Sequence, residues 1–168
     1  PDPQGRVKQL KEVVTLNRAA LTEMRTLLLE LRPEAILSTR FSQLLMYLID
    51  AAKGRGLRDA QLLQEGDEEP PPPDVLVALY RIAQESINNI LKHSKATRFQ
   101  VDLRYEPAGI TLQISDNGRG FDPQQPSAGI GLSSMRERAE KIGAAFHVTS
   151  AVGEGTQIEV VWRYAAPS

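Results

Sequence analysis

The chain has 168 residues, about the size of one domain, and carries 20 lysines and arginines against 21 aspartates and glutamates. Without a basic excess, binding to nucleic acid or to an anionic membrane is not expected, and the absence of cysteine excludes disulfides, thiolate metal sites and cysteine nucleophiles. No apolar run approaches the ~18 residues of a membrane span, and no signal peptide is present. We therefore expect a soluble, cytoplasmic fragment of a larger protein, with no direct membrane contact.

The first segment, residues 7–31, repeats apolar side chains at intervals of three and four, which predicts a long helix with one narrow stripe. The stripe contains one polar member, Asn17, among Val7, Leu10, Val14, Leu21, Met24, Leu28 and Leu31. Pro33 ends this helix because the residue before a proline avoids the helical region. Two interpretations stay open: the helix packs on its own domain, or it belongs to a bundle with a second chain.

A second helix is predicted from residue 41 to residue 52, because its apolar side chains share one face and Gly54 and Gly56 follow it. Residues 57–63 are compatible with a strand, 65–69 form an acidic loop, and prolines 70–73 form a stiff spacer. Asp74 is placed to cap the helix that follows.

The rest of the chain mixes helices with strands. Helical spacing covers residues 75–92 and 132–142, and alternating apolar residues predict strands over 99–105, 110–114, 146–150 and 157–164. Glycines and prolines mark 118–128 as a loop. Hairpin-joined strands with non-alternating helices favour an α+β fold with a mixed, largely antiparallel sheet.

The polar side of the third predicted helix carries a possible phosphate site. Glu85, Asn89 and Lys92 fall in one column at helical spacing, and His93 follows. A carboxylate, a neutral oxygen ligand and a cation suit a magnesium-bound polyphosphate, because Mg²⁺ takes few protein oxygens and keeps phosphate oxygens. A solvated helix face would show the same spacing, so both interpretations remain open.

A second candidate is the stretch SDNGRGFD, residues 115–122, which directly follows a strand. A calcium loop does not fit, because Gly118 and Gly120 stand where oxygen ligands are needed. An aspartate fixed at a strand end, here Asp116, can accept a hydrogen bond from the amino group of adenine, where guanine has a repelling carbonyl. The two glycines would let the backbone approach a flat ligand closely. A glycine turn with no ligand would show the same sequence, so both interpretations remain open.

Two further glycine motifs follow. Gly129-Ile130-Gly131-Leu132 opens the fourth predicted helix, where backbone N–H groups can hold phosphate. It lacks the third glycine and the preceding strand of a dinucleotide-binding fingerprint, and no GxxxxGK[ST] motif occurs. Gly153-Glu154-Gly155-Thr156 links the last two strands, and its hydroxyl can face a ligand. His147 alternates on a strand as an ordinary surface histidine does.

In this order the four motifs resemble the ATP-binding domain of sensor histidine kinases, in the Bergerat-fold group that also includes DNA gyrase and the heat-shock chaperone ATPases. ALYRIAQESINNILKHSKAT (78–97) is similar to the N box, DNGRGFD (116–122) to the G1 box, GIGL (129–132) to the G2 box, and GEGT (153–156) to the closing motif. The segments YRIAQE and MRERAEKIGA are similar to the corresponding sequences of the nitrate-sensor and lipid-thermosensor branch. LLLELRP (27–33) resembles the end of that branch's second dimerisation helix.

The resemblance implies a two-layer sandwich with helices on one face of the sheet, preceded by a long N-terminal helix. It divides the chain into a dimerisation-helix segment, 1–33, and an ATP-binding domain, 34–168. Its cofactors would be ATP and Mg²⁺. The implied roles are magnesium ligand for Asn89, phosphate contacts for Lys92 and His93, adenine contact for Asp116, close ligand approach for Gly118 and Gly120, flexible ATP lid for Gly129, Ile130, Gly131 and Leu132, closure of the adenine pocket for Thr156, and catalytic base for Glu85.

The family's first dimerisation helix, which carries the acceptor histidine, has no match here, since His93 falls in the N box and His147 on a strand. We therefore expect ATP binding without self-phosphorylation. The implied partners are a second copy of the full-length protein and a response-regulator receiver domain, and an unmatched apolar stripe can also form a non-native oligomer. The alternatives are a Bergerat ATPase or anti-sigma-type serine kinase, and a non-catalytic dimerisation module with a degenerate nucleotide pocket.

Overall fold

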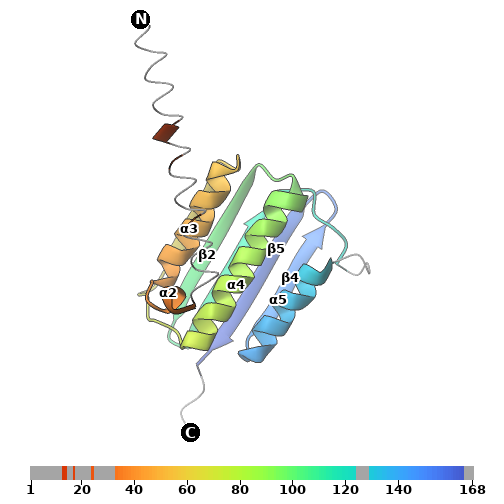
Figure 1. The fold of residues 1–168 in the computed structure, drawn as a ribbon. Helices are drawn as coiled ribbons and strands as arrows, with labels where there is room; N and C mark the ends of the chain where they lie inside the picture. The colour runs from red at the N-terminus through yellow and green to blue at the C-terminus, as the bar shows by residue number, and fades with distance from the viewer. Residues whose placement is uncertain (1–12, 15–16, 18–23, 25–32, 124–128, 165–168) are drawn as a thin grey trace, which may run out of the picture.

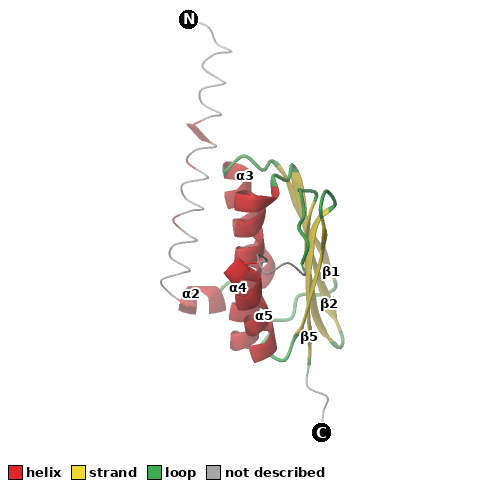
Figure 2. Cartoon of the chain, turned by 90° about the vertical axis from the view of Figure 1, so that its right-hand side faces the viewer, coloured by secondary structure: helices red, strands yellow, loops and turns green. Residues whose placement is uncertain are grey.

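A computed structural model of the chain describes residues 13, 14, 17, 24, 33–123 and 129–164. The elements, in chain order, are α2 (Pro33–Leu37), α3 (Phe41–Gly54), β1 (Asp59–Glu65), α4 (Pro73–Asn89), the π-helical turn η1 (Ile90–Ser94), β2 (Arg98–Glu106), β3 (Gly109–Asp116), α5 (Gly129–Lys141), β4 (Ala145–Ala151) and β5 (Gly155–Arg163). Figure 1 shows α3, α4 and α5 side by side in front of the sheet. Seen from the side, helices and strands form two layers, and the described helices all lie on one face (Figure 2).

The sheet has five strands in the order β1-β2-β3-β5-β4. Strand β1 pairs parallel with β2, whereas the pairs β2–β3, β3–β5 and β4–β5 are antiparallel. The predicted α+β class with a mixed, largely antiparallel sheet is confirmed. The β3–β5 register sets Asp116 directly opposite Thr156, so two residues 40 positions apart in sequence meet at one end of the sheet.

The core lies between the helices and the sheet. The predicted apolar face of the second helix is buried, and its members are Phe41, Leu44, Leu45, Leu48, Ile49 and Ala52. From the strands, inward residues include Phe99, Val101, Leu103, Ile110, Leu112, Ile114, Ile158 and Val160. Complete burial of each such side chain contributes about 1.5–3 kcal/mol. Helix α4 is held in this core along most of its length, and this fixes the position of its polar side.

The predicted helix cap at Asp74 is wrong. Helix α4 begins at Pro73, with Pro72 as its N-cap, and the cap makes no side-chain hydrogen bond. Proline suits the first helical turn because its fixed φ is already helical and the missing N–H would have no partner there. Asp74 lies inside the first turn, where its charge interacts favourably with the helix dipole.

Three other elements have boundaries that differ from the prediction. The regular part of α4 ends at Asn89 and continues as the π-helical turn η1, whereas the sequence predicts one helix to residue 92. Helix α5 begins at Gly129, three residues before the predicted start. Strand β1 lies two residues later than expected. As an edge strand it buries few side chains, so its alternation is weak.

The predicted N-terminal helix lies largely outside the described residues. Of that segment, Val13, Val14, Asn17 and Met24 are described, and all four are helical and exposed. The short helix α2 is not expected from the sequence. The domain boundary after residue 33 remains a prediction. Within the described part of the chain, no helix combines the length and the apolar character that a bilayer span requires.

Candidate functional site

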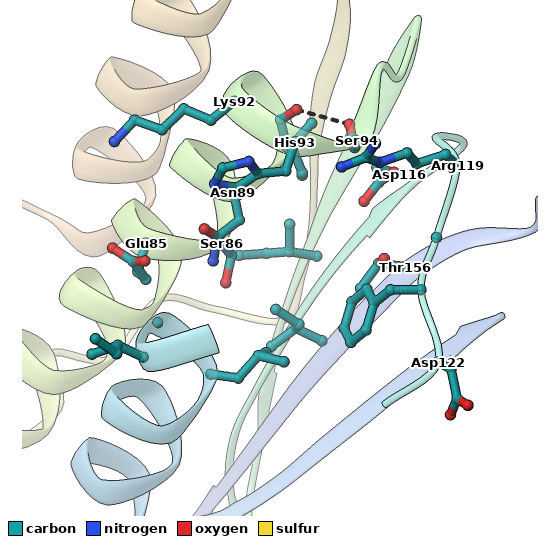
Figure 3. A pocket seen from close by; sticks show the side chains of 18 residues that line it. Glu85, Ser86, Asn89, Lys92, His93, Ser94, Asp116, Arg119, Asp122 and Thr156 are labelled. Carbon is teal, nitrogen blue, oxygen red and sulfur yellow. Dashed lines mark hydrogen bonds between the residues drawn. The ribbon is translucent and has the colours of Figure 1, made fainter. Parts of the chain in front are cut away.

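A pocket of about 480 Å³ opens between α4, η1, the start of α5 and the adjoining ends of β3 and β5. This volume falls in the range of small-molecule sites. Figure 3 shows the side chains that line it. They are Glu85, Ser86, Asn89, Ile90, Lys92, His93, Ser94, Ile114, Asp116, Arg119, Gly120, Phe121, Asp122, Ile130, Gly131, Leu132, Thr156 and Ile158. The pocket therefore contains ten of the site residues predicted from the sequence, Asn89 and Asp116 among them.

Helix α4 supplies Glu85 and Asn89. Both are half-buried and one helical turn apart, beside the buried apolar face of the helix. The start of α5 packs closely on them: a Cβ added to Gly131 would come within 2.5 Å of Glu85 Oε1 and 3.3 Å of Asn89 Nδ2. A side chain at residue 131 would displace the Glu85 carboxylate, so glycine at this position leaves the carboxylate where it is.

The turn η1 supplies Lys92 and His93, both exposed at the pocket. The Ser94 hydroxyl donates to Ile90 O at 2.8 Å, and the turn ends at Lys95 with a φ of 55°. Because a π-helical turn is wider than an α-helical one, the column predicted by α-helical spacing ends at Asn89. Figure 3 shows Lys92 reaching away from Asp116, so the two charges occupy different parts of the pocket.

Asp116 is the last residue of β3. Its Oδ1 accepts a hydrogen bond of 2.7 Å from the Gly118 N–H. Burial raises the pKa of the Asp116 carboxyl above its usual value, and the smaller effect of the Gly118 N–H opposes this. Opposite it, the Thr156 hydroxyl lies 3.0 Å from the Ser150 hydroxyl. A half-buried carboxylate beside a hydroxyl can accept a hydrogen bond from a ligand amino group.

The two glycines after Asp116 each lie against other parts of the chain. A Cβ on Gly118 would collide with Ser94, so this glycine allows the loop to pack on η1. Gly120 lines the pocket, and its φ of +56° with the Ala151 carbonyl directly against it leaves no room for a side chain. Both glycines are needed to form the pocket wall.

The motif Gly129–Leu132, expected as a loop before a helix, is instead the first turn of α5. Ile130 is 88% exposed although it lines the pocket, and Gly131 and Leu132 are half-buried. The two glycines give this segment a low helix propensity, which is why the sequence predicts a loop. In the folded chain the turn packs closely on Glu85, and such tertiary packing overrides the low propensity. The glycines therefore lie within the helix.

Sequence reasoning missed several lining residues: Ser86, Ile90, Ser94, Ile114, Arg119, Phe121, Asp122 and Ile158. A signal was available for some of them. Ile114 and Ile158 alternate on strands that the sequence predicts, and they lie directly opposite each other across β3 and β5. Phe121 lies near the end of the glycine motif, at the pocket wall, where an aromatic ring offers an apolar surface to a flat ligand. Pairing of distant strands, which the sequence does not reveal, places these residues at the pocket.

Residues 74–166, more than half of the chain, match the family model described as histidine kinase-, DNA gyrase B-, and HSP90-like ATPase. The chain belongs to this family. The matched region begins in the first turn of α4 and includes every pocket-lining residue named above. The resemblance inferred from the four motifs is thus confirmed.

Curated relatives are sensor kinases. The chain is 35% identical to sensor histidine kinase LiaS of Bacillus subtilis (strain 168) over 161 residues, covering 92% of this chain and 42% of that protein. It is 36% identical to sensor protein VraS of Staphylococcus saprophyticus over 149 residues, covering 82% and 40%. The chain thus spans less than half the length of these relatives.

A solved structure shares the fold. The histidine kinase domain of the Erythrobacter litoralis EL346 blue-light-activated histidine kinase matches with a TM-score of 0.52 and 23% sequence identity, over 71% of this chain and 64% of that one. At this identity the likeness concerns the fold. It confirms the two-layer arrangement of a histidine kinase ATPase domain.

Proposed function

We propose that the pocket binds ATP with Mg²⁺ and that the chain is the catalytic part of a sensor histidine kinase. The observation that carries the proposal is that Asn89 and Asp116, from a helix and a distant strand, line one cavity of small-molecule size. In this arrangement Asp116 accepts a hydrogen bond from the adenine amino group. Thr156 closes the same end, and Gly120 allows close approach of the base.

The residues present fit a magnesium ion bound mainly by phosphate oxygens. Asn89 offers one neutral oxygen, Glu85 lies one turn away, and the described residues contain no cluster of three acidic, histidine or cysteine side chains that could hold a metal alone. Mg²⁺ commonly takes few protein ligands and completes its shell with water and phosphate. We assign Asn89 as the ligand. The ion would neutralise phosphate charge, and Lys92 would do so from η1, where His93 would also contact the phosphates.

The proposed reaction is transfer of the γ-phosphoryl group to a histidine on a dimerisation helix that this chain does not contain. The acceptor nitrogen forms a bond to the γ-phosphorus, the bond to the β–γ bridging oxygen breaks, and ADP leaves. Glu85 orients the imidazole and accepts its N–H proton. Phosphoryl transfer depends mainly on alignment and charge neutralisation, so one carboxylate and the cations around the phosphates are sufficient.

The first turn of α5, Gly129–Leu132, is the part of the proposed lid nearest the phosphates. Its backbone N–H groups and the helix dipole favour an anion at this position. With 1–33 as part of a dimerisation helix, the full-length protein would act as a homodimer and pass the phosphoryl group to a response-regulator receiver domain. Since ATP is the donor, we expect the domain to work in the cytoplasm.

Calorimetric titration of the chain with Mg·ATP and Mg·GTP tests the nucleotide site. We expect ATP to bind, GTP to bind much more weakly, and Asp116→Asn to reduce ATP affinity about 100-fold, because an amide presents a donor as well as an acceptor to the adenine amino group. A chain that binds neither nucleotide, or whose ATP binding is unaffected by Asp116→Asn, would support a non-catalytic dimerisation module.

Incubation with γ-labelled ATP tests the phosphoryl transfer. We expect no acid-labile label on this chain alone, and label on an added dimerisation helix that carries the acceptor histidine. Glu85→Gln should abolish that label while ATP binding is retained. Rapid ATP hydrolysis or label on serine, with none on histidine, would instead indicate an ATPase or a serine kinase.

A further inference from the structure

We infer that Asn117, which is not among the residues lining the pocket, is a positioning residue that fixes Asp116 and the cationic turn η1 relative to each other. This inference rests on the proposed function, because it assumes that one ligand spans both parts. Asn117 connects two parts of the proposed site. It follows Asp116 directly in the chain, and its side chain holds residues 97–98, which come shortly after Lys92 and His93.

The side chain of Asn117 holds the start of β2. Its Oδ1 accepts hydrogen bonds from the Thr97 N–H at 3.0 Å and the Arg98 N–H at 2.9 Å, and its Nδ2 donates to Thr97 Oγ1 at 2.9 Å. The Asn117 backbone N–H also donates to Arg98 O at 3.2 Å. Four hydrogen bonds from one residue to two consecutive residues define a rigid junction.

The held segment follows a strained turn. Lys95, which ends η1, has a φ of 55°, a left-handed conformation that costs a non-glycine residue about 1–2 kcal/mol. Such strain persists where surrounding contacts over-determine it. On one side the Ala96 N–H donates to Ser94 Oγ at 3.0 Å, and on the other Asn117 holds Thr97 and Arg98. The strained turn therefore depends on Asn117 for its position.

The same junction fixes the loop after β3. The Arg119 N–H donates to Ser94 O at 2.7 Å, and Gly118 packs against Ser94 while donating to Asp116 Oδ1. One continuous set of hydrogen bonds thus runs from Asp116 through residues 117–119 to the end of η1. Loss of the Asn117 side chain leaves the Arg119 N–H bond to Ser94 O and the β2–β3 pairing in place, but it removes the three side-chain hydrogen bonds that hold Thr97 and Arg98 against this loop.

This assignment predicts an effect on ligands that need both parts at once. Asn117→Ala should weaken Mg·ATP binding about tenfold, because two N–H groups lose their acceptor and the turn shifts. Adenosine alone and Mg·tripolyphosphate alone, each using one part, should bind within about twofold of the unchanged chain. Asn117→Asp keeps the acceptor for both N–H groups and should restore ATP binding to within about threefold.

The experiment measures the affinities of the three ligands by titration for the unchanged chain, Asn117→Ala, Asn117→Asp and Thr97→Val, with thermal melting of each. Thr97→Val removes the Thr97 Oγ1 acceptor and should have the smallest effect. Unchanged ATP affinity in Asn117→Ala, or an equal loss for all three ligands, overturns the positioning role. If Asn117→Ala does not fold, failure of Asn117→Asp to retain ATP binding overturns it. An unchanged chain that binds no ATP refutes the proposed function, and this inference with it.

Discussion

The strand-built end of the pocket, around Asp116, Gly120 and Thr156, and its helix-built end, around Glu85 and Asn89, are held in different ways. At the strand-built end, Asp116 accepts a hydrogen bond from the Gly118 N–H, and the Thr156 hydroxyl lies within hydrogen-bond distance of the Ser150 hydroxyl. Ser150 Oγ alone accepts from the Phe121 N–H at 3.0 Å, donates to Gly155 O at 2.9 Å and lies 3.0 Å from Thr156 Oγ1. At the helix-built end, the described side chains of Glu85, Asn89 and Lys92 make no hydrogen bond with the rest of the described chain.

This difference matches what each end would bind. Selection of one base needs a donor or acceptor that is fixed before the ligand binds. Ordering a side chain during binding costs free energy and lowers the affinity for the ligand. A metal-bound triphosphate brings its own charge and oxygens, so the residues around it gain their partners from the ligand. We therefore expect substitutions at the strand-built end to affect folding, and those at the helix-built end to affect ligand binding alone.

The largest effect is expected from Gly120→Ala. Its positive φ and the Ala151 carbonyl against it should together cost about 2–4 kcal/mol of unfolding free energy. Urea denaturation measures this loss. Gly153→Ala is the matched control, because Gly153 also has a positive φ, +89°, but no atom within 4 Å of the added Cβ. A loss of about 1–2 kcal/mol is expected there, and equal losses in both variants would show that packing at Gly120 is unimportant.

Gly131→Ala tests the helix-built end. The added methyl would push against Glu85 Oε1, the far end of a side chain that can move, so unfolding free energy should change by less than about 1 kcal/mol. Mg·ATP affinity should fall about tenfold, because the Glu85 carboxylate is displaced from its position beside Asn89. Titration with Mg·ATP measures the affinity, and thermal melting measures the stability. Glu137→Ala is the control, because Glu137 is exposed on the same helix. A large loss of stability in Gly131→Ala with intact ATP binding would contradict the expectation that substitutions at the helix-built end affect ligand binding alone.

The two ends also differ in how far the sequence predicts them. Strand alternation and the glycine motif place Asp116 and Gly120 correctly at a strand end, because both signals are local. At the helix-built end, the sequence predicts one regular helix as far as Lys92, and a loop at Gly131. Both details are wrong, since the π-helical turn and the early start of α5 depend on packing between distant segments.

Most of the helices and strands are predicted for the same reason, whereas the two layers are implied by the family resemblance and the strand order is known only from the structure. Long apolar patterns, as in α4, are averaged over many residues and predict their element securely. Cap positions such as Asp74, and junctions such as that of Asn117 with Thr97, depend on single hydrogen bonds whose partners are known only from the folded chain. The residue types of a site are thus predictable from local motifs, whereas the contacts that hold them require the structure.

The smallest effect is expected for the unfolding free energy of the chain, which the ionised Asp116 carboxylate lowers because it is partly buried. A carboxyl whose pKa is raised by folding binds its proton more tightly in the folded than in the unfolded state. Stability from this group is therefore greatest below the usual pKa of aspartate and falls as the pH rises through the raised value. Asp116→Asn removes this cost, and its amide oxygen can still accept from the Gly118 N–H.

At pH 7 Asp116→Asn should therefore melt slightly higher than the unchanged chain, by less than the ~2–4 °C that 1 kcal/mol produces in a chain of this size. The advantage should disappear at pH values where Asp116 is protonated. Melting curves over this pH range, with Asp102→Asn as a control on the same sheet, measure the difference. A variant that melts lower at pH 7 would mean that the carboxylate stabilises the strand-built end. A higher melting temperature together with lost ATP binding would indicate that this end keeps an unfavourable charge for its ligand.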